Sequence, residues 1–126
     1  MKAESTDLVD RRAKCAHRRV EAWPEPQKTV QVVKGLAVMV RSLGLAQSAA
    51  ILARRGAPGR RLAEDLAAWL LDQAPMKPLG EGRSDAVGLI ERVIEATPQA
   101  ARAAEEEAIR FLEVLKLFGE LRHGDS

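Results

Sequence analysis

Residues 97–121 read TPQAARAAEEEAIRFLEVLKLFGEL, which contains a strong helix-start signal. Thr97 followed by Pro98 indicates a helix start, because a threonine side chain can cap free backbone amides and proline fits the first turn. After this start, apolar residues recur every three or four positions, at Ala101, Ala104, Ala108, Phe111, Leu115 and Phe118. The stretch therefore predicts a long amphipathic helix, ending at about Leu121, that buries one face in the protein.

The composition predicts an all-α protein. Apolar residues, mostly Ala, Leu and Val, make up 46% of the 126 residues, which is too many for a disordered chain. Aromatic residues make up only 3% and tyrosine is absent, which argues against an all-β sandwich. No apolar run reaches the ~20 residues of a membrane span, and the N-terminus has no signal-peptide pattern. We expect one cytoplasmic domain over 1–126, with a core at about 8–121 and flexible ends at 1–4 and 122–126.

Proline and glycine divide the chain into a bundle of five or six helices, depending on whether Gly44 stops or only kinks a helix. The expected helices span residues 6–22, 26–43, 45–55, 60–73, 85–96 and 98–121. The helix at 26–43 is apolar nearly all round, so we expect it at the centre of the bundle. We expect a loop at 56–59, a longer irregular segment at 74–83, and a helix cap at Ser84.

The expected helices carry apolar stripes that should face the core. In the first helix the stripe is Val9, Ala13, Ala16, Val20 and Trp23. In the helix at 60–73 it is Leu62, Leu66, Trp69 and Leu70. In the helix at 85–96 it is Val87, Ile90, Val93 and Ile94. Glu107 shares a face with buried positions of the last helix, so its carboxylate should accept hydrogen bonds inside the bundle.

The sequence carries no enzyme signature. Phosphate-loop and zinc spacings are absent, and His17 and His123 have no partners at metal-ligand spacing. Cys15 and His17 are two residues apart on a helix and point in different directions, so they form no nucleophile–base pair. The single cysteine, Cys15, excludes an internal disulfide and should be structural or merely exposed. We therefore expect no enzyme activity, no cofactor and no metal site.

Charge is distributed unevenly along the chain. Residues 1–62 contain 13 Lys and Arg against 5 Asp and Glu, whereas residues 63–126 contain 7 against 13. Such asymmetry favours binding to a polyanion or head-to-tail stacking of copies. The simpler explanation is chance, since charged runs are usually solvated helix faces.

Ten basic residues in three clusters are candidate nucleic-acid contacts. The clusters are Arg11, Lys14 and Arg18; Lys34 and Arg41, with Lys28 on the same polar strip; and Arg54, Arg55, Arg60 and Arg61. Lys34 and Arg41 are the favoured pair, because seven residues place them ~10 Å apart along one line of a helix. The aromatic side chains lie on inward stripes, with only Trp23 uncertain, so phosphates would be contacted without base readout. The alternative is that these residues solubilise helices or bind acidic faces of other proteins.

Three segments resemble one known family. The matching positions in the last helix are Arg102, Glu107-Ala108, Phe111-Leu112, Leu115-Lys116 and Phe118. Residues 42–47 resemble the family's Gly-Leu-x-Gln turn, and residues 66–70 resemble its Leu-x-x-Trp-Leu helix. On these residues the chain resembles the small helical subunit of type III-B (Cmr) CRISPR–Cas effector complexes, with the equivalent subunit of Csm complexes as the alternative. Val114 and Leu117 depart from the family's Trp and Arg, and Glu105 stands where Thr is usual.

The resemblance implies a subunit that is not catalytic. Such subunits stack in a few copies beside the backbone subunits that carry the guide RNA. Together with the large signalling subunit, they line the groove in which target RNA pairs with the guide. The implied partners are therefore copies of the chain, the backbone and large subunits, guide RNA and target RNA. The alternative function is a free-standing helical adaptor that binds acidic protein partners and no nucleic acid.

Overall fold

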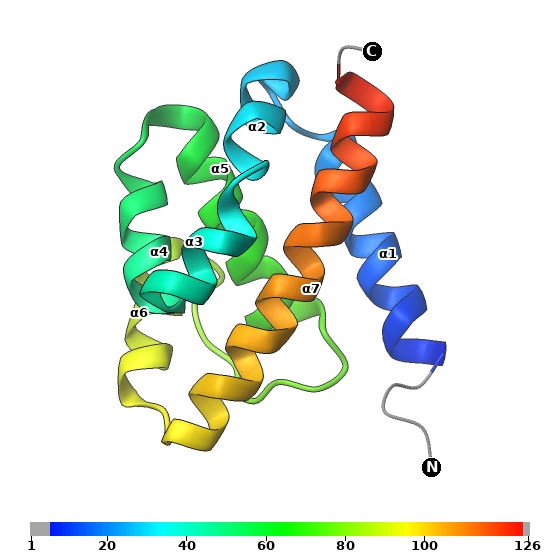
Figure 1. Ribbon diagram of the computed structural model, residues 1–126. Helices are drawn as coiled ribbons and strands as arrows, with labels where there is room; N and C mark the ends of the chain where they lie inside the picture. Colours follow the sequence, from blue (N-terminus) through cyan, green and yellow to red (C-terminus); the bar gives the residue numbers. More distant parts are fainter. Residues whose placement is uncertain (1–5, 125–126) are drawn as a thin grey trace.

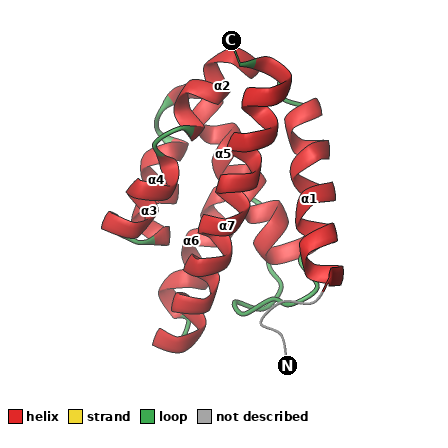
Figure 2. Cartoon of the chain, turned by 45° about the vertical axis from the view of Figure 1, so that its right-hand side comes forward, coloured by secondary structure: helices red, strands yellow, loops and turns green. Residues whose placement is uncertain are grey.

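The computed structural model describes residues 6–124, which form seven α-helices, one π-helical turn and no strand (Figures 1 and 2). The elements are α1 (Thr6–Glu21), α2 (Pro26–Val33), α3 (Leu36–Leu43), α4 (Leu45–Ala53), α5 (Gly56–Ala68), the π-helical turn η1 (Trp69–Gln73), α6 (Ala86–Glu95) and α7 (Pro98–His123). The predicted all-α class is confirmed. The expected flexible segment at 1–4 lies outside the described residues, as do 125 and 126.

The long helix that the sequence predicted, α7, crosses the whole bundle. The Thr97 side chain accepts a hydrogen bond from the Ala100 amide at 3.1 Å, and Pro98 occupies the first turn. In Figure 1, α7 runs diagonally across the molecule, beside α1 on one side and α2 and α3 on the other. Four of its predicted core residues are fully buried, namely Ala104, Ala108, Phe111 and Leu115. Ala101 and Phe118 are half-buried.

The central helix is α5, and the prediction that residues 26–43 occupy the centre is wrong. α5 packs against α2, α4, α6 and α7. Its buried residues are Gly59, Leu62, Ala63, Asp65, Leu66, Ala67 and Ala68. Small alanines let neighbouring helices approach on several sides, whereas the segment at 26–43 leaves Val38 and Leu43 exposed. The predicted inward stripe at 60–73 is confirmed.

The predicted single helix at 26–43 is also wrong. α2 ends at Val33 and α3 begins at Leu36, because the backbone leaves the helical region at Gly35 (φ −103°, ψ 8°). Glycine costs about 1 kcal/mol in a helix interior relative to alanine, so a break is least costly there. Of the stop or kink expected at Gly44, the structure shows a stop, since its φ of 85° suits glycine and separates α3 from α4.

Helix α1 is rotated relative to its predicted stripe. Ala16, Val20 and Trp23 are buried as predicted, but Val9 is exposed. Arg12 and Cys15 are buried in its place. The physical reason is an ion pair made by Arg12 inside the bundle, which periodicity of apolar residues alone does not show.

Helix α6 is rotated in a similar way. Val87 and Ile94, both predicted to face inward, are 51% and 71% exposed. The face turned to the core instead contains Ala86, Gly88 and Leu89. Because two of these residues are small, α6 can lie close to α4, its main neighbour. Larger apolar side chains of the same helix are thereby left on the surface.

The starts of α5 and α6 also differ from prediction. The expected loop at 56–59 forms the first turn of α5, which begins at Gly56. A side chain at Gly59 would collide with the Leu52 carbonyl of α4, so glycine is required for this tight connection. The cap of α6 is Asp85 and not Ser84, because Asp85 accepts a hydrogen bond from the Gly88 amide at 2.8 Å. The irregular segment before α6 is confirmed, and Arg92 holds it through two hydrogen bonds to the Leu79 carbonyl.

Two buried carboxylates join distant parts of the chain. Glu107 accepts hydrogen bonds from Arg12 Nε at 2.6 Å, Arg12 Nη2 at 2.9 Å and Trp69 Nε1 at 2.9 Å. Asp65 accepts bonds from Arg19 Nε at 2.6 Å and Trp23 Nε1 at 2.8 Å. The expectation that Glu107 accepts hydrogen bonds inside the bundle is confirmed. Each carboxylate thus ties a guanidinium of α1 and an indole to the core.

Replacing Glu107 should destabilise the fold strongly. Glu107→Ala leaves the Arg12 guanidinium buried without its carboxylate, which typically costs about 3–5 kcal/mol of unfolding free energy. Chemical denaturation monitored by circular dichroism measures this loss. The matched control is Glu120→Ala, an exposed position of the same helix, for which a change within about 0.5 kcal/mol is expected. The double variant Arg12→Ala/Glu107→Ala should lose less unfolding free energy than the two single variants lose in total. Strict additivity of the two losses would contradict the coupling between these residues.

Candidate nucleic-acid interface

The ten candidate basic residues do not form one surface. Arg11, Lys14 and Arg18 lie on α1, whereas the cluster at 54–61 lies at the α4–α5 junction. Figure 1 shows these two regions on opposite flanks of the molecule. Lys28 and Lys34 lie on and just after α2, which packs against α5 at the same end as the α4–α5 junction. The first and third clusters are therefore on separate surfaces, and the second is divided between α2 and α3.

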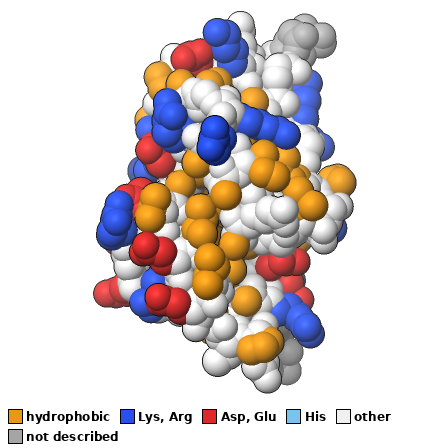
Figure 3. All heavy atoms as spheres, turned by 90° about the vertical axis from the view of Figure 1, so that its left-hand side faces the viewer, with side chains coloured by type: hydrophobic (Ala, Val, Ile, Leu, Met, Phe, Trp, Pro, Cys, Tyr) orange, Lys and Arg blue, Asp and Glu red, His pale blue; other side chains and the backbone are white. Residues whose placement is uncertain are grey.

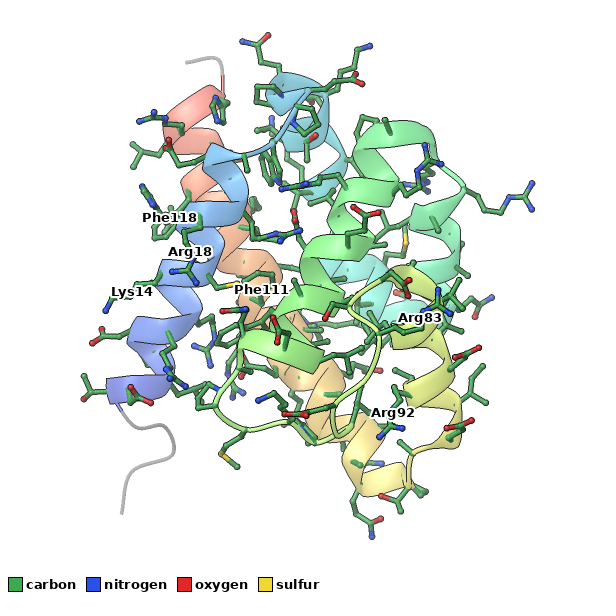
Figure 4. All side chains as sticks on the ribbon, turned by 180° about the vertical axis from the view of Figure 1, so that it is seen from behind. Lys14, Arg18, Arg83, Arg92, Phe111 and Phe118 are labelled. Carbon is green, nitrogen blue, oxygen red and sulfur yellow. The ribbon has the colours of Figure 1, made fainter. Side chains whose placement is uncertain are left out.

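The first cluster follows the outer side of α1. All three side chains are exposed, and Arg11 Nε lies 3.8 Å from the Asp7 carboxylate. Lys14 and Arg18 form no ion pair within residues 6–124. In Figure 4 they lie along the same edge of the α1–α7 pair as Phe118. These two cations thus border an apolar side chain.

The second cluster lacks the geometry that the sequence predicted. Lys34 follows α2 and Arg41 belongs to α3, so the expected spacing along one continuous helix does not hold. Arg41 Nη2 lies 3.4 Å from the Glu113 carboxylate, and Lys28 Nζ lies 3.3 Å from that of Glu25. Lys34 alone in this cluster is exposed without an ion pair among the described residues.

The third cluster retains three unpaired arginines. Arg54 ends α4, Arg55 precedes α5, and Arg60 lies one turn into α5, all with exposed side chains. Arg61 differs, since its side chain is largely buried and its Nε lies 3.3 Å from the Asp65 carboxylate. Figure 3 shows basic side chains gathered in the upper part of the face that carries α4 and α6. Arg54, Arg55 and Arg60 are hereafter called the basic end.

The aromatic side chains give little surface for base stacking. Trp23, which the sequence left uncertain, is buried and donates its indole N–H to Asp65. Trp69 stacks on Phe111 with ring centroids 5.5 Å apart, and both rings are buried. Only Phe118 is half-buried. Contacts to nucleic acid from the basic end would therefore be made to phosphates.

The buried titratable groups are engaged in the fold. Burial raises the pKa of Cys15 from 9.0 to about 11, although Arg19 and Arg18 lower it in part. Burial also raises the pKa of Asp65, with the Trp23 hydrogen bond and Arg19 acting in the opposite direction. The described part of the chain contains no group of three His, Cys, Asp or Glu side chains arranged to hold a metal ion. None of its helices is both long and apolar enough to span a membrane.

The spacing of charges could have revealed part of this pairing. Asp7–Arg11 and Arg61–Asp65 are four residues apart, and Glu25–Lys28 are three apart, which are distances at which helical side chains meet. The pair formed by Arg41 with Glu113 joins residues far apart in the sequence, so local spacing gives no signal for it. Sequence reasoning therefore identified the cations but could not separate all the paired ones from the free ones.

The fold and these surfaces define a small all-α bundle whose exposed cations lie on separate surfaces. Residues 8–121 match the sequence model of the CRISPR-associated protein family Cas_Cmr5. Since the match spans most of the chain, the protein belongs to the Cas_Cmr5 family, the small subunits of type III-B (Cmr) CRISPR systems. The resemblance found in the sequence is thus confirmed, and the Cmr type is favoured over Csm. No curated protein and no solved structure matches the chain.

The raised pKa of Cys15 predicts slow alkylation. The thiolate is the reactive form, so a rise from 9.0 to about 11 lowers its fraction near pH 8 about 100-fold. Iodoacetamide labelling at pH 8, followed by mass spectrometry, should be at least 100-fold slower in the folded protein than in urea. Because the folded pKa is the higher one, the rate should rise with pH up to about 11. Equal rates in the folded and unfolded chain would contradict the burial of Cys15.

Proposed function

We propose that this protein is a non-catalytic subunit of a cytoplasmic type III CRISPR effector complex and contacts RNA phosphates through its basic end. The observation that carries the proposal is the set of three exposed arginines at the α4–α5 junction without ion pairs among the described residues. Membership of the Cas_Cmr5 family supports association with a CRISPR effector complex. The RNA in question is the target strand or its duplex with the guide.

Free arginines are better phosphate ligands than paired ones. A guanidinium can donate two parallel hydrogen bonds to a phosphate, and its charge is permanent. Arg41 and Lys28 would first have to give up contacts with Glu113 and Glu25. Arg54, Arg55 and Arg60 form no ion pair among the described residues, so they can bind a phosphate without first breaking another contact. This favours the third cluster over the Lys34–Arg41 pair that the sequence favoured.

The proposed lack of catalysis is supported by the state of the buried acids. Catalytic carboxylates need free lone pairs directed into a cleft, whereas Asp65 and Glu107 are each occupied by an arginine and a tryptophan. Cys15 lies in the core with a raised pKa, which is unsuitable for a nucleophile. We propose that cleavage and signalling chemistry belong to other subunits.

The proposed partners are the backbone and large signalling subunits, guide and target RNA, and further copies of the chain. The alternative function is a free-standing adaptor that binds acidic protein partners. Family membership favours the complex over the adaptor. The two predict different behaviour on purification, since only the subunit should elute from native cells in a large particle that contains guide RNA.

Reversing charge at the basic end should weaken binding of target RNA. We expect the triple variant Arg54→Glu, Arg55→Glu, Arg60→Glu to enter the complex but to lose up to three phosphate contacts. The slope of log affinity against log salt should then fall by about 2 to 3, at ~0.7–0.9 for each contact. Filter binding of target RNA to the assembled complex across a salt series measures this slope, and gel densitometry verifies incorporation.

The matched control reverses three basic residues elsewhere, Lys77→Glu, Arg102→Glu and Lys116→Glu, with the same change in net charge. Its salt slope should remain close to that of the wild type. The proposal fails if the basic-end variant keeps the wild-type slope. It fails equally if both triple variants lose the same affinity, because that would indicate a general effect of net charge.

A further inference from the structure

An apolar groove with a basic rim lies between α1 and α7. Ala13, Lys14, His17, Arg18 and Phe118 line a hollow of about 370 Å³. Its floor is apolar, with the Phe118 ring in edge contact with His17 at a centroid distance of 6.3 Å. Figure 4 shows Lys14 and Arg18 on the α1 side of this groove. Neither cation has an ion-pair partner in residues 6–124.

The α7 side continues the apolar surface beyond the hollow. Leu117 is 61% exposed and Leu121 is 83% exposed, and the two are four residues apart on one face of the helix. Large exposed apolar side chains that lie together mark contact surfaces more often than isolated ones do. The α1–α7 groove therefore has one apolar wall, an apolar floor and one basic wall.

The opposite flank of the molecule carries the complementary pattern. On α6, Val87 and Ile94 are exposed and Ile90 between them is half-buried, forming an apolar ridge. Glu91 and Glu95 run beside this ridge, both exposed and without an ion pair in the described part of the chain. Figure 3 shows hydrophobic side chains gathered in a band on this face. α6 thus presents an acidic, amphipathic outer side, hereafter the α6 ridge.

The two surfaces also match in spacing. Lys14 and Arg18 are four residues apart on α1, and Glu91 and Glu95 are four apart on α6, so each pair spans about 6 Å along its helix axis. One helix laid against the other can therefore bring both acidic groups to both basic groups in a single register. The apolar ridge would at the same time cover Phe118 and the exposed leucines of α7.

We propose that the α6 ridge of one copy docks in the α1–α7 groove of the next copy. The occupant is a second copy because the chain itself carries the apolar and acidic surface that this groove requires. The inference rests on the proposed function for the presence of several copies in one complex, and it names the faces that meet. It also assigns Lys14 and Arg18 to protein contact instead of RNA.

The position of the two surfaces determines the kind of assembly. α1 and α6 lie on opposite flanks in Figure 1, so the contact joins two different faces. Such a head-to-tail contact leaves one free face at each end, and copies add in a row unless their rotation closes a ring. The basic end lies in the upper part of the face that carries the α6 ridge, so in such a row it would border the contact with the next copy.

Zero-length crosslinking of the assembled complex tests the contact directly. Carbodiimide should form an amide between Lys14 and Glu91 or Glu95 of adjacent copies, giving a ladder of dimers and larger multimers on denaturing gels. Mass spectrometry should identify the crosslinked peptides. The matched control is Lys14→Arg, which keeps the charge but lacks a primary amine, and should lose these crosslinks while it retains the copy number.

Two results would overturn the inference and separate it from the proposed function. Several copies per complex by native mass spectrometry, without a crosslink between Lys14 and the α6 acids, would contradict these docking faces alone. A single copy per complex would contradict stacking itself. Binding of RNA through the basic end is measured independently of both.

Charge reversal provides a second test at exposed positions that the fold does not need. We expect Lys14→Glu/Arg18→Glu, and separately Glu91→Lys/Glu95→Lys, to lower the copy number or to weaken self-association at least tenfold. All four substitutions in one chain should restore association to within about threefold of wild type, because the attraction is re-formed with reversed signs. Absence of this restoration would contradict the pairing of these four residues.

Discussion

The bidentate ion pair between Arg12 and Glu107 sets the positions of α1 and α7. Both groups lie in a core that excludes water, where an unpaired charge would be very costly. The carboxylate also accepts the Trp69 indole, so three segments far apart in the sequence converge on two oxygen atoms. Such hydrogen bonds are directional, unlike apolar contacts, and they admit only one rotation of α1. That rotation brings Cys15 into the core and leaves Val9 outside.

The same chemistry explains part of the charge asymmetry along the sequence. Arg12, Arg19 and Arg61 come from the basic first half, and they neutralise Asp65 and Glu107 of the acidic second half. Some of the basic residues counted in the sequence are therefore paired inside the fold, where they join the two halves of the chain. What remains for a ligand is a smaller and more localised set of cations, concentrated at the α4–α5 junction. The uneven distribution of charge along the sequence therefore reflects ion pairs within the fold as well as the exposed cations.

Local sequence signals predicted much of the fold but not the orientation of its helices. The Thr97-Pro98 start, an interruption at Gly44 and the irregular segment at 74–83 were predicted correctly, because capping and backbone preference act within a few residues. The buried faces of α1 and α6 were predicted wrongly. The periodicity of large apolar side chains gives no signal for a buried ion pair or for a small buried residue such as Gly88. Likewise, the sequence identified the ten candidate cations, but Arg41 could not be paired with Glu113 without the tertiary fold.

These two rotations have a common consequence for the surface. When Arg12 is drawn inward on α1, and Ala86 and Gly88 are drawn inward on α6, apolar side chains of both helices are turned outward. A monomer gains nothing from exposing Val87 and Ile94, since each would be stabilised by leaving water. The arrangement becomes favourable if the exposed faces are covered by another copy, so that packing within one chain and contact between chains are satisfied together. The constraint that orients the helices inside the bundle would then also create the surfaces through which bundles meet.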